Sequence, residues 1–544
     1  MASIYVIHTP ADNEANPIRL SVRVIKALLR HTARAPLNGA PGSNTHVRIW
    51  PDSSPDLLYS LDMRLDPDTC YQTMLSKDRR FDGWFFVGVS STGIYCRPVC
   101  PVRAPRRENC HFFANAAAAE RAGFRPCLRC RPELAPGNGL LDVSSRLAHA
   151  AAMLIEEGFL NTGSLADLAA RVGVTDRHLR RIFDAQFGVS PLEFAQTQRL
   201  LMAKRLLTDT RLPVNAVALA AGFGSVRRFN DLFLKQYGLN PLRFRKQTDA
   251  RHAPDAQSVT FTLVYRPPFC WSGILAFLAR RQIAGVEHIG DEIYTRTLAL
   301  SHHGREIHGW ISARHTPKRY ALEVTLPMSL MPAVGQLLPR VRRLFDLDAR
   351  PDLIDPHLGD LAAGSPGIRV PGAMDGFEIA VCALAGPSLH SSSTQSILSR
   401  IAERFGTQVS APQALTRIFP SAATLARAPA CALEDTGMTR KRADAIVALA
   451  SEVSSGRMRL EPAAPLEDTL RALRSIQGVS EWAVQYIAMR ALAWPNAFPP
   501  CDLTLKKQLG YASASALGRH AQQWEPWRAY ATLHMWSQLE GQHS

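Results

Sequence analysis

Short apolar runs and period-two alternation of hydrophobic and polar positions predict several strands. These segments are residues 85–89, 258–265, 293–299 and 320–326. Elsewhere the apolar positions follow helical spacing. Helices are predicted at 114–122, 272–281 and 333–345, and over most of the chain from Ala373 onwards, between breaks rich in Pro, Gly and Ser. The chain therefore combines helical regions with mixed α+β regions.

Residues 140–248 are predicted to be helical and contain an internal repeat. The repeated positions are Phe183, Phe187, Gly188, Ser190, Pro191 and Phe194 in one copy, and Phe233, Tyr237, Gly238, Asn240, Pro241 and Phe244 in the other. Each copy reads as helix, glycine-containing turn, helix, and then a helix with proline at its first position. This order predicts two helix-turn-helix units joined by a helix from Pro191 to about Leu207.

The first 62 residues differ from the rest, since Pro, Gly, Ser, Asn and Asp are mixed there with a single short apolar stretch, Ile18 to Leu29. We expect them to be an extension without ordered structure, upstream of a native start at Met63. Linkers are predicted at 136–139 and 248–257 from their polar, Pro- and Gly-containing composition.

Composition and charge narrow the class of protein. Of the 544 residues 46% are hydrophobic and 20% are charged, which is typical of a globular chain with several domains. We expect neither a membrane-spanning helix nor a secretion signal, because the required apolar patterns are missing. The net charge of +16 favours a polyanionic partner, nucleic acid before an anionic membrane surface.

Five of the ten cysteines cluster between residues 96 and 130. Cys96 and Cys100 form one close pair, Cys127 and Cys130 another, and two such pairs are typical of a tetrahedral Zn²⁺ site. From spacing alone, a purely structural zinc knuckle remains the alternative. Cys110 lies outside both pairs and is expected to be a buried core thiol. Arginines crowd the cysteines, where they would offset the thiolate charge while facing phosphate.

The sequence around these cysteines resembles the N-terminal zinc domain of the Ada family. The matching stretches are residues 92–100, 107–109 and 122–130. The resemblance implies direct repair of methylphosphotriesters in DNA, with Cys96 as the irreversible methyl acceptor. A zinc-bound thiolate is deprotonated at neutral pH and can attack the methyl carbon. Methylation would remove a negative charge beside phosphate and so tighten DNA binding, which is a regulatory switch.

The Ada resemblance also implies contacts with the DNA backbone. Thr92, Arg103 and Arg125 match positions that make such contacts in the family. Pro101 stands where a further arginine is usual, and in this respect the chain departs from the family pattern.

The repeat resembles the AraC-type DNA-binding domain. Ser164 is expected to cap the first short helix, and Thr175 and Ser225 precede the two expected recognition helices. Such a helix presents its N-terminal residues to base edges in the major groove. The residues expected to contact DNA are Arg177, His178, Arg180 and Arg181 in the first unit, and Arg227, Arg228 and Asn230 in the second. The alternative is the solvated polar face of ordinary helices.

Residues 258–540 resemble the AlkA family of 3-methyladenine DNA glycosylases. Residues 476–482 resemble the helix-hairpin-helix turn, which grips a DNA phosphate, often with a bound monovalent cation; Gly478 and Ser480 are the expected contacts. Residues 498–502, Phe-Pro-Pro-Cys-Asp, follow about twenty residues later. This pairing is the signature of the helix-hairpin-helix glycosylases, and it implies that Asp502 is the catalytic carboxylate.

The chemistry of alkylated bases agrees with a single carboxylate. Because alkylation at a ring nitrogen makes the base cationic and a good leaving group, the enzyme mainly needs to stabilise oxocarbenium character and orient water. The flipped base would enter a pocket of electron-rich rings that attract a cation. By family position these rings are Phe277, Trp482, Tyr486 and Trp536. Trp482 stands where lyase-competent relatives carry lysine, so we predict a monofunctional glycosylase.

The chain departs from the AlkA pattern at three places. Ser480 replaces the last glycine of the hairpin, and Leu503 replaces an aromatic residue after the aspartate. Residues 386–390 replace the stretch that usually carries the DNA-wedging side chain, and Leu389 is the candidate wedge. The unusual 386–390 stretch motivates an alternative, a transcriptional regulator whose glycosylase-like half binds DNA without catalysis.

Together these patterns predict a multidomain α+β protein. The predicted parts are an extension (1–62), a small zinc-bound α/β domain (63–135), an all-α double helix-turn-helix (140–248), an α+β TATA-box-protein-like domain (258–370) and an all-α helix-hairpin-helix glycosylase domain (371–540). We expect a bifunctional methyl-responsive activator and 3-methyladenine glycosylase that binds one Zn²⁺ and both alkylated and promoter DNA. Its other expected properties are RNA polymerase as a partner, a monomeric state, no membrane binding, and a bacterial, nucleoid-associated cytoplasmic location. A glycosylase with a merely structural zinc is a second alternative.

Overall fold

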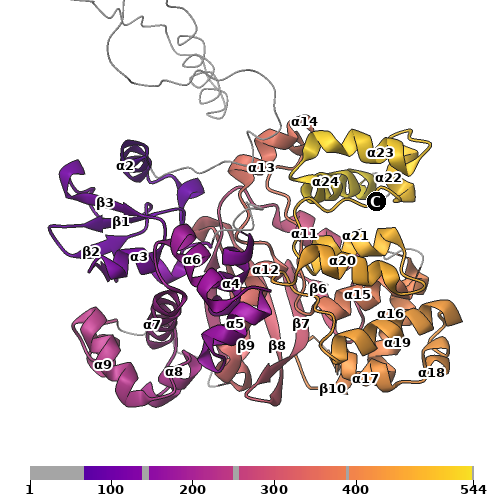
Figure 1. Cartoon of the computed structure of the whole chain (residues 1–544), viewed down its shortest axis with the longest axis horizontal. Coiled ribbons are helices and arrows are strands. Elements are labelled where there is room, and N and C mark those ends of the chain that lie inside the picture. The colour runs from indigo at the N-terminus through magenta and orange to yellow at the C-terminus, as the bar shows by residue number, and fades with distance from the viewer. Residues whose placement is uncertain (1–65, 138–145, 249–256, 387–390, 414, 542–544) are drawn as a thin grey trace, which may run out of the picture. The chain divides into compact units, whose positions relative to one another are not determined.

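The structure is a computed structural model that describes residues 66–137, 146–248, 257–386, 391–413 and 415–541 (Figure 1). The predicted extension at 1–62 and the candidate wedge Leu389 lie outside these residues. Among the described helices, none is long and apolar enough to cross a membrane.

The cysteine-rich segment folds around a small four-stranded sheet with the order β3-β1-β2-β4. Its strands are β1 (Phe86–Val89), β2 (Ile94–Cys96), β3 (Cys110–Phe113) and β4 (Arg125–Pro126), and its helices are α2 (Pro67–Ser76) and α3 (Ala116–Arg121). Strand β1 pairs with β2 and β3 in antiparallel fashion, whereas β2 pairs with β4 in parallel. The predicted strand at 85–89 and helix at 114–122 are confirmed within two residues.

Within residues 146–248 the repeat forms seven α-helices and one short 3-10 helix, Phe159–Asn161. The α-helices are α4 (Arg146–Glu156), α5 (Leu165–Arg171), α6 (Asp176–Phe187), α7 (Pro191–Asp209), α8 (Val214–Ala220), α9 (Val226–Tyr237) and α10 (Pro241–Thr248). Helices α6 and α9 both end at a glycine in the left-handed conformation, Gly188 and Gly238. Helix α7 starts with Pro191 behind a capping box formed by Ser190 and Glu193. The predicted pair of helix-turn-helix units joined by one helix is confirmed.

The mixed region contains a five-stranded antiparallel sheet with the order β5-β9-β8-β7-β6. Its strands are β5 (Ser258–Val264), β6 (Glu287–Gly290), β7 (Ile293–His302), β8 (Arg305–Thr316) and β9 (Ala321–Pro327), and its helices are α11 (Trp271–Ala279), α12 (Val334–Leu344), α13 (Pro351–Leu358) and α14 (Asp360–Ala363). The sequence prediction missed β6 and β8 of this sheet. In β8, two of the three buried positions are the small residues Gly309 and Ala313, and the third is Ile311. Gly309 is required there, since a Cβ atom would lie 2.6 Å from the Leu330 side chain.

The remainder of the described chain is helical, as predicted from Ala373 onwards, apart from the short pair β10 (Thr407–Gln408) and β11 (Arg417–Ile418). The helices are α15 (Gly376–Ala385), α16 (Ser392–Phe405), α17 (Ala422–Arg427), α18 (Ala430–Glu434), α19 (Arg440–Ser454), α20 (Leu466–Ser475), α21 (Glu481–Arg490), α22 (Leu503–Gln508), α23 (Ala514–His520) and α24 (Arg528–Gly541). Residues Phe377–Ala385 of α15 are all buried, and this helix packs against α19 and α21. It forms the centre of the helical core, and the predicted multidomain α+β class is confirmed.

Candidate functional site

The four paired cysteines meet at one point of the small sheet. Cys96 is the last residue of β2, and Cys127 directly follows β4, which pairs with β2 in parallel through Tyr95 and Pro126. The Sγ atoms of Cys96, Cys100, Cys127 and Cys130 all lie within 4.8 Å of one another, and all four residues are buried. A tetrahedral Zn²⁺ with Zn–S bonds of about 2.3 Å needs sulfur atoms about 3.8 Å apart. The cluster therefore fits the one Zn²⁺ that the sequence predicts.

Arg97 supports this cluster from inside the fold. Its main-chain N–H lies 3.4 Å from the Cys130 sulfur, and its Nη1 donates to the Cys130 carbonyl at 3.1 Å. The guanidinium also forms an ion pair with the buried carboxylate of Asp82. The expectation that the arginines around the cysteines face phosphate is therefore wrong for Arg97, because a hydrogen-bonded ion pair makes its burial affordable.

Thr92, Arg103 and Arg125 are exposed, and their contacts with the DNA backbone stay predictions. Cys110 is a core thiol, as predicted: it is buried with Phe85 and Val87, and its thiol donates to the carbonyl of Arg106.

The predicted DNA-contacting side chains lie at the starts of α6 and α9. Thr175 and Ser225 cap these helices by accepting the N–H groups of His178 and Arg228. Arg177, Arg180, Arg181, Arg227 and Arg228 are exposed, whereas His178 and Asn230 are half-buried. Arg180 forms an ion pair with Asp176 one turn earlier, and Arg181 contacts the His178 ring. The structure thus presents Arg177, Arg227 and Arg228 most openly, and base contacts by any of the seven stay predictions.

In the glycosylase-like half, Asp502 is held by two hydrogen bonds. Its Oδ1 accepts the N–H of Leu505 at 2.9 Å and thereby caps α22, while its Oδ2 accepts the indole N–H of Trp482 at 2.9 Å. Only 8% of Asp502 is exposed. The carboxylate therefore has a fixed orientation, with one oxygen toward the helix and the other toward an aromatic ring.

The four predicted pocket rings form one continuous cluster. Trp482 stacks on Tyr486 with ring centroids 5.1 Å apart and planes 14° from parallel. Tyr486 lies 6.3 Å from Trp536, and Trp536 lies 6.4 Å from Phe277 with planes 21° from parallel. The ring contacts thus run without a break from Trp482 to Phe277.

Two arginines that the sequence analysis did not single out border this cluster. The guanidinium carbon of Arg281 lies 3.8 Å from the centroid of the Phe277 ring and 5.8 Å from that of Trp536. Arg490 lies 5.2 Å from Phe277 and donates to the Tyr486 hydroxyl at 2.7 Å. The four-residue spacing between Phe277 and Arg281 is a signal that could have indicated the first contact. Nothing local in the sequence indicates the second.

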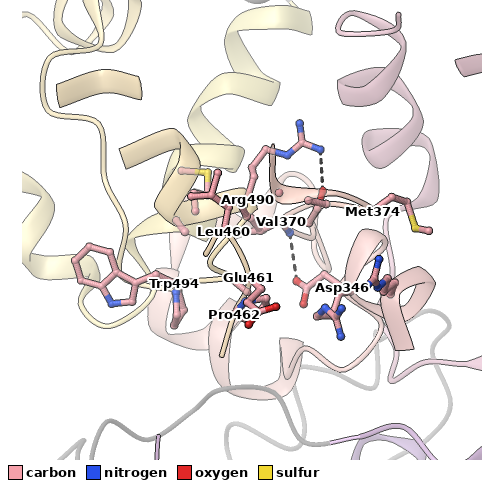
Figure 2. A pocket seen from close by; sticks show the side chains of 18 of the residues that line it. Asp346, Val370, Met374, Leu460, Glu461, Pro462, Arg490 and Trp494 are labelled. Atoms are coloured by element: carbon pink, nitrogen blue, oxygen red, sulfur yellow. Dashed lines mark hydrogen bonds between the residues drawn. The ribbon is translucent and has the colours of Figure 1, made fainter. Parts of the chain in front are cut away.

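Arg490 also lines a cavity of about 200 Å³ (Figure 2). Its Nε and Nη2 donate to the carbonyls of Pro371 and Gly372 at 2.7 and 2.9 Å. In the same cavity the half-buried Asp346 accepts the Val370 N–H and the Tyr530 hydroxyl, at 3.3 and 2.8 Å. Burial raises the pKa of Asp346 to about 6.

The turn between α20 and α21 has the local geometry of the predicted hairpin. Gly478 has φ +97°, and a Cβ atom there would lie 3.1 Å from both the Lys441 carbonyl and the Ala445 side chain. Glycine is therefore required at this position. Ser480, the departure from the family pattern, caps α21 by accepting the Ala483 N–H at 3.2 Å. Phosphate binding by this turn, and its monovalent cation, stay predictions.

The geometry defines the class of protein. One chain carries a four-cysteine zinc domain, a double helix-turn-helix, and a helical domain whose carboxylate contacts a cluster of aromatic rings. Comparison with known families agrees. Residues 69–133 match the metal-binding domain of Ada, residues 168–247 match a helix-turn-helix domain, and residues 260–375 match the AlkA N-terminal domain. The four cysteines accordingly hold one Zn²⁺.

For three relatives, the match with this chain extends over almost the whole of the relative. A Mycobacterium tuberculosis protein described as "Probable bifunctional transcriptional activator/DNA repair enzyme AlkA" is 36% identical over 88% of this chain and 97% of its own. DNA-3-methyladenine glycosylase 2 of Escherichia coli is 32% identical over 51% of this chain and 96% of its own. The bifunctional transcriptional activator/DNA repair enzyme AdaA of Bacillus subtilis is 32% identical over 36% of this chain and 90% of its own. The chain belongs to the family of AlkA-type bifunctional transcriptional activator/DNA repair enzymes.

Proposed function

We propose that the protein excises 3-methyladenine-type bases from DNA as a monofunctional glycosylase and that it also accepts methyl groups from DNA methylphosphotriesters as a signal for transcription. The observation that carries the first activity is the contact of Asp502 with Trp482 at the end of the ring cluster. The relatives' descriptions as glycosylase and as bifunctional activator and repair enzyme support both activities.

In the glycosylase reaction the rings bind the base and Asp502 faces the sugar. A cationic purine is attracted to the π faces of Trp482, Tyr486, Trp536 and Phe277. As the N-glycosidic bond breaks, positive charge moves to the sugar, where the fixed carboxylate of Asp502 stabilises it and orients the attacking water. With tryptophan at position 482 there is no amine to form a Schiff base, so the DNA strand stays intact.

Release of 3-methyladenine from methylated DNA by the wild type and by Asp502→Asn tests this activity. Asparagine still caps a helix well, so α22 should remain folded. Asp360→Asn, which changes an exposed aspartate at the start of α14, is the matched control. We expect release by the wild type and the control but not by Asp502→Asn. Release by none of the three would support the non-catalytic alternative, and equal release by all would show that another group is the carboxylate.

In the methyl transfer we propose Cys96 as the acceptor. Zinc keeps the thiol deprotonated at neutral pH. The Cys96 sulfur attacks the methyl carbon, the S–C bond forms, the O–C bond breaks, and the phosphate diester leaves as an anion. The exposed residues Thr92, Arg103 and Arg125 would hold the DNA backbone beside it.

Mass spectrometry tests the acceptor. After incubation with DNA carrying methylphosphotriesters, we expect one added methyl group on the peptide that contains Cys96. Cys110→Ser, at the core thiol outside the cluster, should be methylated like the wild type. No added methyl group would support the alternative of a structural zinc, and a methyl group on Cys100, Cys127 or Cys130 would move the acceptor role.

As an activator the protein would bind promoter DNA as a monomer and contact RNA polymerase. In-vitro transcription with protein methylated beforehand tests this role, and we expect more transcript than with unmethylated protein. Equal transcript would refute methyl-dependent activation. Sedimentation at increasing concentration tests the monomeric state.

A further inference from the structure

One buried arginine holds the ring cluster against the main chain. Arg490 is the last residue of α21, and only 5% of it is exposed. Its Nη1 donates to the Tyr486 hydroxyl at 2.7 Å, while its Nε and Nη2 donate to the carbonyls of Pro371 and Gly372 at 2.7 and 2.9 Å. Because the guanidinium is planar and its donors have a fixed fork geometry, these three bonds together determine where the Tyr486 hydroxyl lies relative to the main chain.

The contacts of Tyr486 continue as far as the Asp502 carboxylate. Trp482, Tyr486 and Arg490 are spaced four residues apart, so they follow one face of α21. Trp482 stacks on Tyr486 with ring planes 14° from parallel, and its indole N–H donates to Asp502 at 2.9 Å. A rotation of the Tyr486 ring would therefore displace the Trp482 ring and, with it, the donor that holds Asp502.

The charge of Arg490 strengthens its bond to Tyr486. Burial lowers the pKa of Arg490, but Tyr486 and Glu287 outweigh burial and raise the pKa above its ordinary value. The guanidinium therefore stays charged inside the fold. A hydrogen bond from a charged donor is about twice as strong as one between neutral groups, so the Tyr486 hydroxyl is held firmly.

We propose that Arg490 is a positioning residue of the glycosylase site. This proposal rests on the glycosylase activity proposed above. Arg490 fixes Tyr486, Tyr486 supports Trp482, and Trp482 orients Asp502. Arg490 thus governs the alignment of the carboxylate with the sugar without touching the reacting atoms. An arginine that merely stabilised the fold would hold the 371–372 carbonyls, and its effect would not depend on the Tyr486 hydroxyl.

A double-mutant cycle between Arg490 and Tyr486 tests this dependence. Single-turnover release of 3-methyladenine is measured for the wild type, Tyr486→Phe, Arg490→Met and the double variant, with folding of each checked by urea unfolding. Tyr486→Phe keeps the ring but removes the hydroxyl, and it should lower the rate about tenfold. The rate loss caused by Arg490→Met should be about tenfold smaller in the Tyr486→Phe background than in the wild type, because the bond through which it acts is already gone. Equal losses in the two backgrounds would overturn the proposal.

Arg369→Met is the matched control for this cycle. Arg369 is 1% exposed and donates to the carbonyls of Arg266 and Pro268 at 2.6 and 3.0 Å, so it is also a buried arginine that holds the main chain. The rate loss caused by Arg369→Met should be the same with and without the Tyr486 hydroxyl. If this loss also shrank in the Tyr486→Phe background, the coupling would not be specific to Arg490 and the proposal would be wrong.

A second cycle does not require Arg490→Met to fold. Tyr486→Phe and Trp482→Phe interrupt the same path to Asp502, so the double variant should be no more than about twofold slower than the slower single variant. Losses that multiply would overturn the proposal and leave the glycosylase activity established. Absence of base release by the wild type would instead refute the glycosylase activity on which the proposal rests.

Discussion

The hydrogen bond between Trp482 and Asp502 can be removed without removing the ring. Trp482→Phe deletes the indole N–H, whose nitrogen lies 2.9 Å from the Asp502 oxygen, and keeps an aromatic side chain to stack on Tyr486. Of the two hydrogen bonds of the Asp502 carboxylate, the variant then retains only the one from the Leu505 N–H. One oxygen of the carboxylate becomes free to turn, which weakens its alignment with the developing charge on the sugar.

The expected size follows from the bond. A hydrogen bond to a charged group contributes about 1.5–3 kcal/mol, and each 1.4 kcal/mol corresponds to a factor of about ten, so kcat should fall roughly 10- to 150-fold. The KM should change by no more than about twofold, because the ring that contacts the base remains.

Single-turnover release of 3-methyladenine from methylated DNA measures this effect. Trp494→Phe is the matched control, because Trp494 is also half-buried but lines the cavity that Asp346 borders (Figure 2). If Trp482→Phe retains more than about a third of the wild-type rate, Asp502 is positioned by its helix cap alone and the reasoning is wrong.

Three further predictions concern stability, metal and DNA. Burial raises the pKa of Asp346 from 3.8 to about 6, so ionising this carboxyl costs folding free energy as the pH rises through that range. The free energy of unfolding of Asp346→Asn, measured in urea, should therefore rise relative to the wild type by up to about 3 kcal/mol between about pH 4 and 7. If the difference in the free energy of unfolding between the variant and the wild type shrank with rising pH, the raised pKa would be contradicted. Elemental analysis should find one zinc per chain in the wild type and in Cys110→Ala, and much less zinc in Cys130→Ala, which loses a ligand. The slope of log K against log salt concentration for promoter binding should fall by about one in Arg227→Ala. It should fall less in Arg180→Ala, because Arg180 is already paired with Asp176, and equal slopes would contradict this.

Local chemistry explains which parts the sequence alone could predict. The zinc ligands are two pairs of neighbours, and a tetrahedral site needs four sulfurs at one point, so spacing nearly determines the set. The second helix-turn-helix unit could be predicted because it repeats the first. Strand β8 could not, because two of its three buried positions are small residues, and one of them, Gly309, packs against Leu330.

The glycosylase site depends on long-range packing instead. Phe277 and Trp536 are far apart in the chain, and their parallel rings meet only because α11 and α24 fold together. Only the family resemblance indicated them. The resemblance did not indicate Arg281 and Arg490, and it did not reveal that Arg97 turns inward to Asp82. From the sequence alone, charged residues of this kind are expected at the surface, because their buried partners cannot be identified.

Helix α7 has a consequence for the length of the operator. Both helix-turn-helix units pack against this one continuous helix of 19 residues, which spans about 28 Å. That length is of the order of the roughly 34 Å between successive major grooves on one side of B-DNA. If α6 and α9 are the recognition helices, the two half-sites would be read at a fixed separation by one polypeptide, where many regulators use two subunits. Inserting half a helical turn between them would turn one half-site to the far side of the duplex.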